Sequence, residues 1–253
     1  MYIARTGNIH KIEKGDRMSD YSYNSIKTSG KYTYKPVNRL ANATIILLAI
    51  YVFISLIGLW SNGVEYSILQ DWENATEREI NISDIRQGII GGFQLILFIA
   101  YLVIFLIWLN RYSKNTHAMS KSNLTYTPGW TVGYFFIPIM SLFRPYQALS
   151  ELYMENVKNN NTIISAWWGT WLISIVISRI SFKTSMKAET ISELQRANIF
   201  TIISDSSDII CLSFLMYVVW TMTKHQIAKR QAVVHQAPPP EIQSAQNIES
   251  AYE

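Results

Sequence analysis

Residues 122–148 read SNLTYTPGWTVGYFFIPIMSLFRPYQA, and this stretch decides the fold. It is apolar enough to enter a bilayer, yet it contains Pro128, Pro138 and Pro145. Proline removes a backbone donor and interrupts a helix. Inside lipid, a broken backbone is tolerated only where protein or water surrounds it. The stretch therefore predicts the centre of a helical membrane protein rather than one straight span.

Apolar runs free of Asp, Glu, Lys and Arg lie on both sides of this stretch. A helix needs about 20 apolar residues to cross a hydrocarbon core of roughly 30 Å, whereas Pro128 to Phe143 gives only about 24 Å of helix. The second run opens with Gly88, Gly91 and Gly92, whose small size predicts that another helix packs closely there. We predict an all-α, polytopic membrane protein with four transmembrane helices, at about 40–60, 87–109, 163–181 and 198–222.

The two ends of the chain have the composition of tails. Residues 1–36 contain almost no aliphatic side chains, which predicts a disordered cytoplasmic segment. Residues 232–253 are rich in Gln and Ser and contain a proline triplet that begins at Pro238, so they predict a second disordered tail. The sequence leaves open whether translation starts at Met1 or Met18.

The helical membrane domain is predicted over 37–231. Within it, 127–141 is expected to form a proline-broken segment that is either re-entrant or interfacial. Residues 142–157 place apolar side chains along one face of a helix, while Glu151 and Glu155 lie on the other. This pattern predicts an amphipathic helix in the membrane interface.

The distribution of Lys and Arg predicts the orientation. Residues 1–39 hold eight of these side chains, whereas Ser61–Arg86 holds two and is strongly acidic. Four spans would place 16 Lys and Arg inside and 6 outside, and five spans would place 15 and 7, so charge does not separate the two arrangements. The short broken segment favours four spans, which predicts a multi-pass membrane protein with both termini in the cytoplasm.

Charge, sequence motifs and the number of His and Cys residues also restrict the classes of function that this protein can have. The net charge of +4 is accounted for by loop charges that set orientation, so nucleic-acid binding is not predicted. The sequence contains no Walker loop, dinucleotide fingerprint, His-Glu-x-x-His or Gly-x-Ser-x-Gly motif. His10, His117, His225 and His235 are far apart and Cys211 is the single cysteine, so neither a metal site nor a cofactor is predicted. An enzyme is left open as the least favoured class.

Three charged side chains fall inside the predicted spans. Charges are costly in lipid and usually mark an ion pair, a cavity or a function. Asp205 and Asp208 are three residues apart and share a helix face. Antiparallel neighbours would bring Arg179 to the same level, so we expect an intramembrane charge pair between Arg179 and one of the aspartates. A proton or ion pathway and simple snorkelling of the side chains are the alternatives.

A long motif in the chain resembles that of a known family. It comprises Trp108-Leu109-Asn110-Arg111, Asn115, Thr127-Pro128-Gly129-Trp130, Val132-Gly133-Tyr134-Phe135-Phe136, Pro138, Arg144-Pro145-Tyr146-Gln147-Ala148 and Trp167-Trp168. With the exit from Thr223 to Gln231, the chain resembles the bacterial membrane family DUF4328, a domain of unknown function, from about Val37 to Gln231. The resemblance implies a small inner-membrane protein with several helices, and it carries over no catalytic residue.

These observations favour a non-enzymatic membrane protein that binds a partner protein or a lipid-like ligand through 127–148. Broken segments expose backbone polar groups at membrane depth, where binding sites are often built. Besides the bilayer, a membrane protein or a second copy of the chain are the expected partners. The candidate contact residues are Trp130, Pro138, Arg144, Pro145, Tyr146 and Gln147.

Two other interpretations of these residues stay open. In the first interpretation, Pro138 and Pro145 merely turn the chain back to the surface, and Arg144 caps that turn. On the other, the protein is a small transporter, or conducts ions or protons through Asp205 and Asp208.

Overall fold

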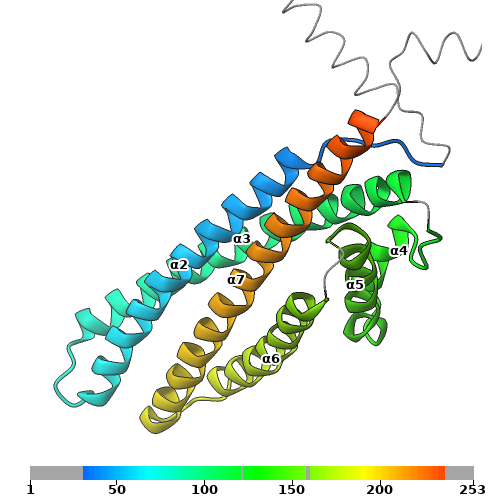
Figure 1. Ribbon diagram of the computed structural model, residues 1–253. Helices are drawn as coiled ribbons and strands as arrows, with labels where there is room; N and C mark the ends of the chain where they lie inside the picture. The colour runs from blue at the N-terminus through cyan, green and yellow to red at the C-terminus, as the bar shows by residue number, and fades with distance from the viewer. Residues whose placement is uncertain (1–30, 121, 158–159, 237–253) are drawn as a thin grey trace, which may run out of the picture.

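The computed structural model describes residues 31–120, 122–157 and 160–236, and these residues form helices joined by short connections (Figure 1). Most of the two predicted tails, 1–36 and 232–253, lies outside the described residues. The elements are α2 (Asn38–Gln70), α3 (Glu77–Met119), α4 (Pro128–Gly133), η1 (Tyr134–Phe136), η2 (Met140–Leu142), α5 (Arg144–Val157), α6 (Thr162–Ser185) and α7 (Ile191–Gln236).

Four of these helices, α2, α3, α6 and α7, are long and apolar enough to cross a membrane. The chain is thus a multi-pass helical membrane protein. The 43 residues of α3 correspond to about 65 Å of helix, well beyond a hydrocarbon core of roughly 30 Å, so its ends project from the apolar layer. Helices α2, α3 and α7 also run past the limits of the predicted spans, because polar residues continue the same helices.

The connection between α2 and α3 is short because α3 begins at a capping box. The Thr76 hydroxyl accepts a hydrogen bond from the Glu79 backbone N–H at 3.3 Å, and the Glu79 carboxylate accepts one from the Thr76 backbone N–H at 2.9 Å. Two unpaired donors at the start of the helix are satisfied in this way. Hydrogen bonds from Thr76 hold the pKa of Glu79 below its ordinary value, and the bond from the Thr76 backbone has a larger effect than the bond from its side chain.

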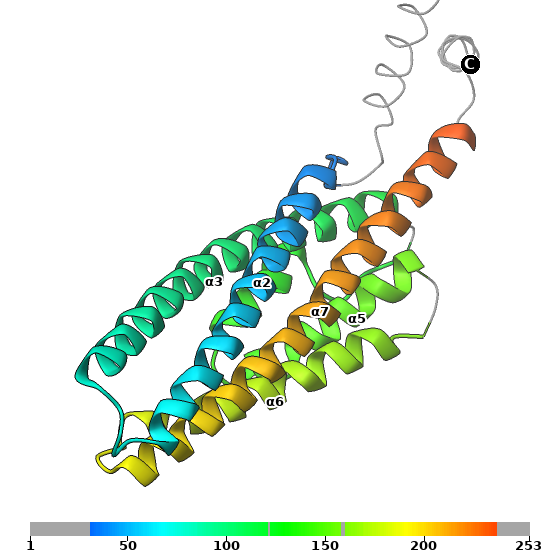
Figure 2. The ribbon, with the colours of Figure 1, turned by 90° about the vertical axis from the view of Figure 1, so that its left-hand side faces the viewer.

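The spanning helices stand in a row in which α2 lies between α3 and α7, and α6 packs on the far side of α7 (Figure 2). Successive helices run in opposite directions, so both ends of the described chain lie at one end of the row (Figure 1). We call this the terminal end, and the end with the connections 71–76 and 186–190 the loop end. Helices α4 and α5 pack beside the terminal end, between α3 and α6.

Apolar side chains face outward along the spanning helices. Phe53 of α2 is 63% exposed and Ile96 of α3 is 65% exposed, as expected for surfaces that face lipid. The most deeply buried side chains instead gather at the terminal end, where α3, α5, α6 and α7 meet. They include Trp108, Tyr112, Leu149, Leu152, Ile164, Val218 and Met222.

Two expectations from the sequence differ from the structure. A Cβ atom added at Gly88, Gly91 or Gly92 would meet nothing within 4 Å, so the predicted close packing of a helix on these glycines is wrong within this chain. Residues 31–36, assigned to a solvated tail, instead run beside α3. The Arg111 guanidinium donates to the Pro36 carbonyl at 3.4 Å. Backbone hydrogen bonding to a neighbouring helix, which composition does not reveal, accounts for this difference.

Candidate functional site

The first half of the broken element is fixed to α3 by side chains of the 108–131 region. Thr127 is extended, and Pro128 begins α4, where the missing proline N–H costs no helical hydrogen bond. The Asn110 amide donates to the Pro128 carbonyl at 3.0 Å. The Thr131 hydroxyl bonds the Thr127 carbonyl at 3.0 Å and lies 3.5 Å from the Ser113 hydroxyl. Helix α4 is therefore held by polar side chains at its first turn.

The tip of the broken element, residues 136–143, presents apolar side chains outward. Phe136 is 69% exposed and Ile139 is 75% exposed. Pro138 lies within this tip, and its carbonyl accepts a hydrogen bond from the Ser141 hydroxyl at 2.7 Å. The indole N–H of Trp168 donates to the Leu142 carbonyl at 3.2 Å, which ties the tip to α6. An apolar tip with paired carbonyls is suited to lipid contact.

Arg144 lies at the start of α5, and its charge is held within the broken element. Its guanidinium donates to the Tyr126 hydroxyl at 3.2 Å and to the Gln147 amide oxygen at 3.1 Å. The Tyr126 hydroxyl also donates to Gln147 at 2.7 Å. Trp130 joins this group through rings, since it stacks on Tyr134 at 5.1 Å and Tyr134 meets Tyr126 edge-on at 6.1 Å. Of the predicted contact residues, Trp130, Arg144 and Gln147 thus form one connected group.

The other predicted contact residues lie apart from that group. Tyr146 faces α6, where its hydroxyl is 2.9 Å from the Ser165 hydroxyl and accepts from the Asn161 amide at 3.2 Å. Pro145 is buried in the first turn of α5, and Pro138 is at the exposed tip. These three residues therefore shape and anchor the element, in keeping with the alternative interpretation of the prolines as turn residues.

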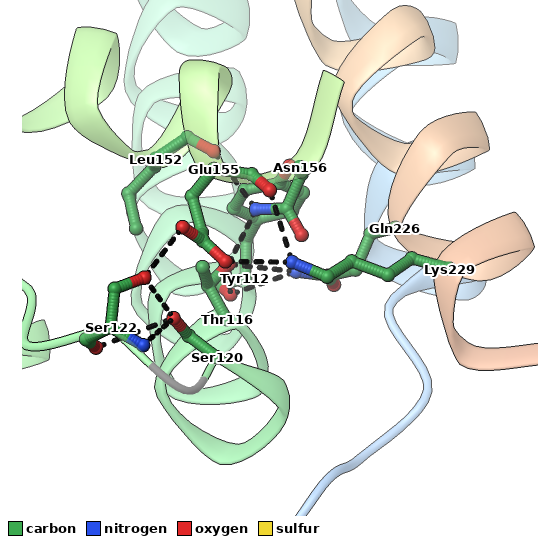
Figure 3. Close-up of polar contacts among 9 residues, drawn as sticks. All are labelled: Tyr112, Thr116, Ser120, Ser122, Leu152, Glu155, Asn156, Gln226 and Lys229. Carbon is green, nitrogen blue, oxygen red and sulfur yellow. Dashed lines mark hydrogen bonds and ion pairs between the residues drawn. The ribbon is translucent and has the colours of Figure 1, made fainter. Parts of the chain in front are cut away.

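A buried polar network joins α3, α5 and α7 behind the broken element (Figure 3). Its centre is the Thr116 hydroxyl, which donates to the Tyr112 carbonyl and accepts from the Asn156 amide at 2.9 Å and from the Gln226 amide at 3.1 Å. Gln226 also donates to the Tyr112 carbonyl at 3.0 Å. Buried amides that find partners on three helices fix the positions of those helices relative to one another.

One ion pair borders this network, between Glu155 of α5 and Lys229 of α7 at 2.8 Å (Figure 3). The Ser122 hydroxyl donates to the same carboxylate at 2.8 Å. Burial alone would raise the pKa of Glu155, but the hydrogen bonds from Lys229 and Ser122 and the charge of Lys229 hold that pKa below its ordinary value. Glu155 is therefore ionised at neutral pH and holds α5 against α7.

Residues 31–35 are attached to the same network through Asn115. The Asn115 amide donates to the Lys35 carbonyl at 2.7 Å, and the Lys35 backbone N–H donates to the Asn115 side-chain oxygen at 2.9 Å. Asn115 is fully buried and also donates to the Gln226 amide oxygen at 3.1 Å. The segment is thus paired with α3 much as one strand pairs with another.

This attachment creates a cleft of about 640 Å³ between residues 31–35, α3 and α4. We call it the basic cleft. Among the described residues, its charged lining residues are Lys31, Lys35, Arg111 and Lys114, and none of its described lining residues is a carboxylate. None of the four cations forms an ion pair with another described residue. The remaining wall includes Leu106, Ile107 and Val132, so the cleft combines positive charge with an apolar surface.

The predicted intramembrane charge pair is not formed. No ion pair joins Arg179 to Asp205 or Asp208 within the described ranges. The Asp205 carboxylate instead accepts a hydrogen bond from the Asn62 amide of α2 at 2.9 Å, while Ser174 of α6 lies beside Asp208. The sequence argument correctly predicted that the helices carrying Arg179 and the two aspartates are antiparallel neighbours. It could not predict the direction in which each side chain points. Among the described residues, no group of three His, Cys, Asp or Glu could hold a metal ion.

Sequence reasoning missed Asn115, Asn156 and Gln226 as the residues that organise the terminal end. The sequence contained a signal for two of them, because Asn115 and the segment 223–231, which includes Gln226, belong to the motif that carries the family resemblance. Asn115 and Gln226 lie beyond the ends of the predicted spans 87–109 and 198–222, and Asn156 lies in the predicted amphipathic helix 142–157. Only the positions of the helices show that they meet.

A comparison with known families gives one match. The model of a domain of unknown function, DUF4328, matches residues 73–224, which is more than half of the 253-residue chain. The matched region contains α3, the broken element, α6 and most of α7. No curated protein and no solved structure matches the chain.

Proposed function

We propose that this chain, which belongs to the DUF4328 family, is a non-enzymatic membrane protein that binds an anionic, lipid-like molecule in the basic cleft. The observation that carries the proposal is the cleft itself. It gathers Lys31, Lys35, Arg111 and Lys114 beside an apolar wall, and no carboxylate is among its described lining residues. Four cations that lack ion-pair partners among the described residues favour an anionic ligand.

An amphiphile suits this cleft better than a soluble anion. The cleft is lined by these cations and also by the apolar side chains of Leu106, Ile107 and Val132. Trp130, which is 52% exposed, lies in an adjoining hollow with Lys31 and Tyr32. Exposed indoles and lysines close to the end of a spanning helix are typical of the headgroup level. A phosphate-bearing headgroup with an acyl chain would therefore satisfy both surfaces.

The same charges support an orientation. The cytoplasmic side of a membrane protein carries the excess of Lys and Arg, and anionic lipids enrich that leaflet. The terminal end holds the basic cleft together with Arg39, Arg144, Lys224 and Lys229, whereas the 71–76 connection at the loop end carries Asp71 and Glu73 and no Lys or Arg. We therefore propose that the terminal end faces the cytoplasm of a bacterial inner membrane, with both termini inside.

The proposal can be tested by native mass spectrometry of the protein extracted from its own membrane. The test variant is Lys31→Gln, Lys35→Gln, Lys114→Gln, which removes three charges from the cleft. The matched control removes three charges at the loop end, as Lys183→Gln, Lys187→Gln, Arg196→Gln, where Glu193 lines the same hollow. Each headgroup contact by Lys is worth about 1 kcal/mol, so the test variant should lose anionic lipid by at least roughly tenfold.

The outcomes separate binding of a lipid from binding of a protein. Anionic phospholipid that remains on the wild type and the control but leaves the test variant supports the proposal. Equal retention by all three proteins would show that the cleft does not hold the lipid. A specific co-purifying protein, lost with the same three lysines, would replace the lipid by a protein partner.

A further inference from the structure

A second cleft lies inside the membrane domain, and residues of all four spanning helices line it. It has a volume of about 300 Å³, a size within the lower range of ligand pockets. Helices α3 and α6 form its sides, and residues of α2 and α7 form its floor. These helices include α3 and α6, which stand at the two ends of the row (Figure 2). We call it the lateral cleft.

Two opposite charges line the lateral cleft without meeting. Asp208 of α7 and Arg179 of α6 are both in its wall, and no ion pair joins them within the described ranges. Asp205, one turn away on α7, is not part of the wall and is bonded to Asn62. Separate charges in a low-dielectric setting are costly unless each gains a partner. A ligand that carries both charges would provide one partner to each.

The positions of Asp208 and Arg179 along the membrane normal follow from hydroxyl pairs between α6 and α7. Ser174 lies 2.8 Å from Ser207 and Ser178 lies 2.9 Å from Ser204, which sets the register of the two helices. Asp208 is therefore level with Ser174, about halfway along α6. Arg179 lies roughly 7 Å nearer the loop end, at 1.5 Å of rise per residue. The two charges thus follow one another along the membrane normal.

Aromatic rings surround the acidic part of the cleft. Tyr101 meets Tyr51 edge-on at 5.6 Å and Phe98 at 5.4 Å, and Trp171 lines the same wall. Aromatic faces beside a carboxylate are the chemistry that recognises ammonium groups. The guanidinium of Arg179 in turn suits a phosphate.

We propose that the lateral cleft binds a zwitterion with an ammonium and an anionic group, such as the headgroup of an ethanolamine phospholipid. The ammonium lies at Asp208 among the rings, and the phosphate lies at Arg179. The acyl chains remain in the bilayer between α3 and α6. This site is separate from the basic cleft and does not depend on it.

Retention of defined lipids by purified protein tests this site. The probes are phosphatidylethanolamine and phosphatidylglycerol with identical acyl chains, measured by native mass spectrometry after exchange in mild detergent. Asp208→Asn keeps the size of the side chain and removes its charge, and Asp205→Asn is the matched control on the same helix. Arg179→Gln tests the other charge at a position that is exposed and not needed for packing.

Wild type and Asp205→Asn should retain phosphatidylethanolamine over phosphatidylglycerol by about tenfold, and Asp208→Asn should lose that preference. Arg179→Gln should retain less phosphatidylethanolamine, so this variant decides the matter if Asp208→Asn does not fold. Soluble phosphoethanolamine that binds the wild type as tightly as the phospholipid would identify a free zwitterion as the ligand, and much weaker binding than the phospholipid would identify the lipid. Equal selectivity in wild type, Asp208→Asn and Arg179→Gln would overturn the proposal.

Discussion

Asn115 of α3 and Lys35 of the N-terminal segment exchange two hydrogen bonds, at 2.7 Å from the Asn115 amide and at 2.9 Å from the Lys35 backbone N–H. The pair holds residues 31–35 against α3 and so forms one wall of the basic cleft. Asn115 also reaches Gln226 of α7, which links the cleft wall to the buried network. One side chain thus connects the proposed ligand site to the core.

Replacing Asn115 with alanine should release the N-terminal segment. The change removes three hydrogen bonds and leaves the Gln226 amide oxygen with fewer partners, a loss of about 1–3 kcal/mol in the free energy of unfolding. Trypsin should cut after Lys31 faster in Asn115→Ala than in the wild type. Asn74→Ala at the loop end, where the amide bonds only Asp71, is the control. Unchanged cleavage would show that Asn115 does not hold the segment.

The ion pair between Glu155 and Lys229 should make stability depend on pH. Because hydrogen bonds lower the pKa of Glu155 in the folded state, its contribution is complete above the ordinary value of 4.5 and is lost as pH falls through the lower folded pKa. The difference in unfolding free energy between wild type and Glu155→Gln should thus be largest at neutral pH. It should shrink below about pH 4.5. A difference that grows with acid would contradict this assignment.

Trp168→Phe should loosen the tip of the broken element. The change keeps an aromatic ring but removes the N–H that bonds the Leu142 carbonyl. Amide hydrogen exchange in residues 137–143 should accelerate, since a carbonyl without a partner favours local opening. Trp60→Phe, which alters an exposed indole of α2, serves as the control. Equal exchange in both variants would mean that the tip is held by packing alone.

Double-mutant cycles should couple Asp205 to Asn62 and not to Arg179. The Asn62 amide lies 2.9 Å from the Asp205 carboxylate, so alanine substitutions at these positions should show a coupling of about 0.5–3 kcal/mol. Arg179→Ala and Asp205→Ala should be additive within about 0.5 kcal/mol. The measurement is thermal or denaturant unfolding in detergent. Strong coupling between Arg179 and Asp205 would contradict the arrangement of α6 and α7 described above.

The helices could be predicted because span length and charge exclusion depend on local composition. Runs of about 20 apolar residues identify spanning helices, and Pro128 and Pro138 identify the break. The same composition could not predict that helices extend beyond the apolar layer, as α3 does, since polar residues with good helix propensity look like loops.

The site was only partly predictable, because side-chain direction depends on how the helices are rotated. Arg144 and Gln147 were expected to contact a ligand, and the structure shows them bonded to each other and to Tyr126. Arg179 was expected to pair with Asp205 or Asp208, yet Arg179 and Asp208 line one cleft separately and Asp205 bonds Asn62. The basic cleft was not predicted, because Lys31 and Lys114 are far apart in the sequence and line one cleft only where Asn115 holds the Lys35 backbone against α3.

The most direct test of the basic cleft is a titration with a soluble anionic amphiphile, dodecyl phosphate, at low and at high salt. Wild type and the loop-end control Lys183→Gln, Lys187→Gln, Arg196→Gln should bind it, and affinity should fall as salt screens the cleft. The variant Lys31→Gln, Lys35→Gln, Lys114→Gln should bind at least roughly tenfold more weakly, at about 1 kcal/mol per lost charge. Equal affinity of this variant and the wild type at low salt would contradict the account.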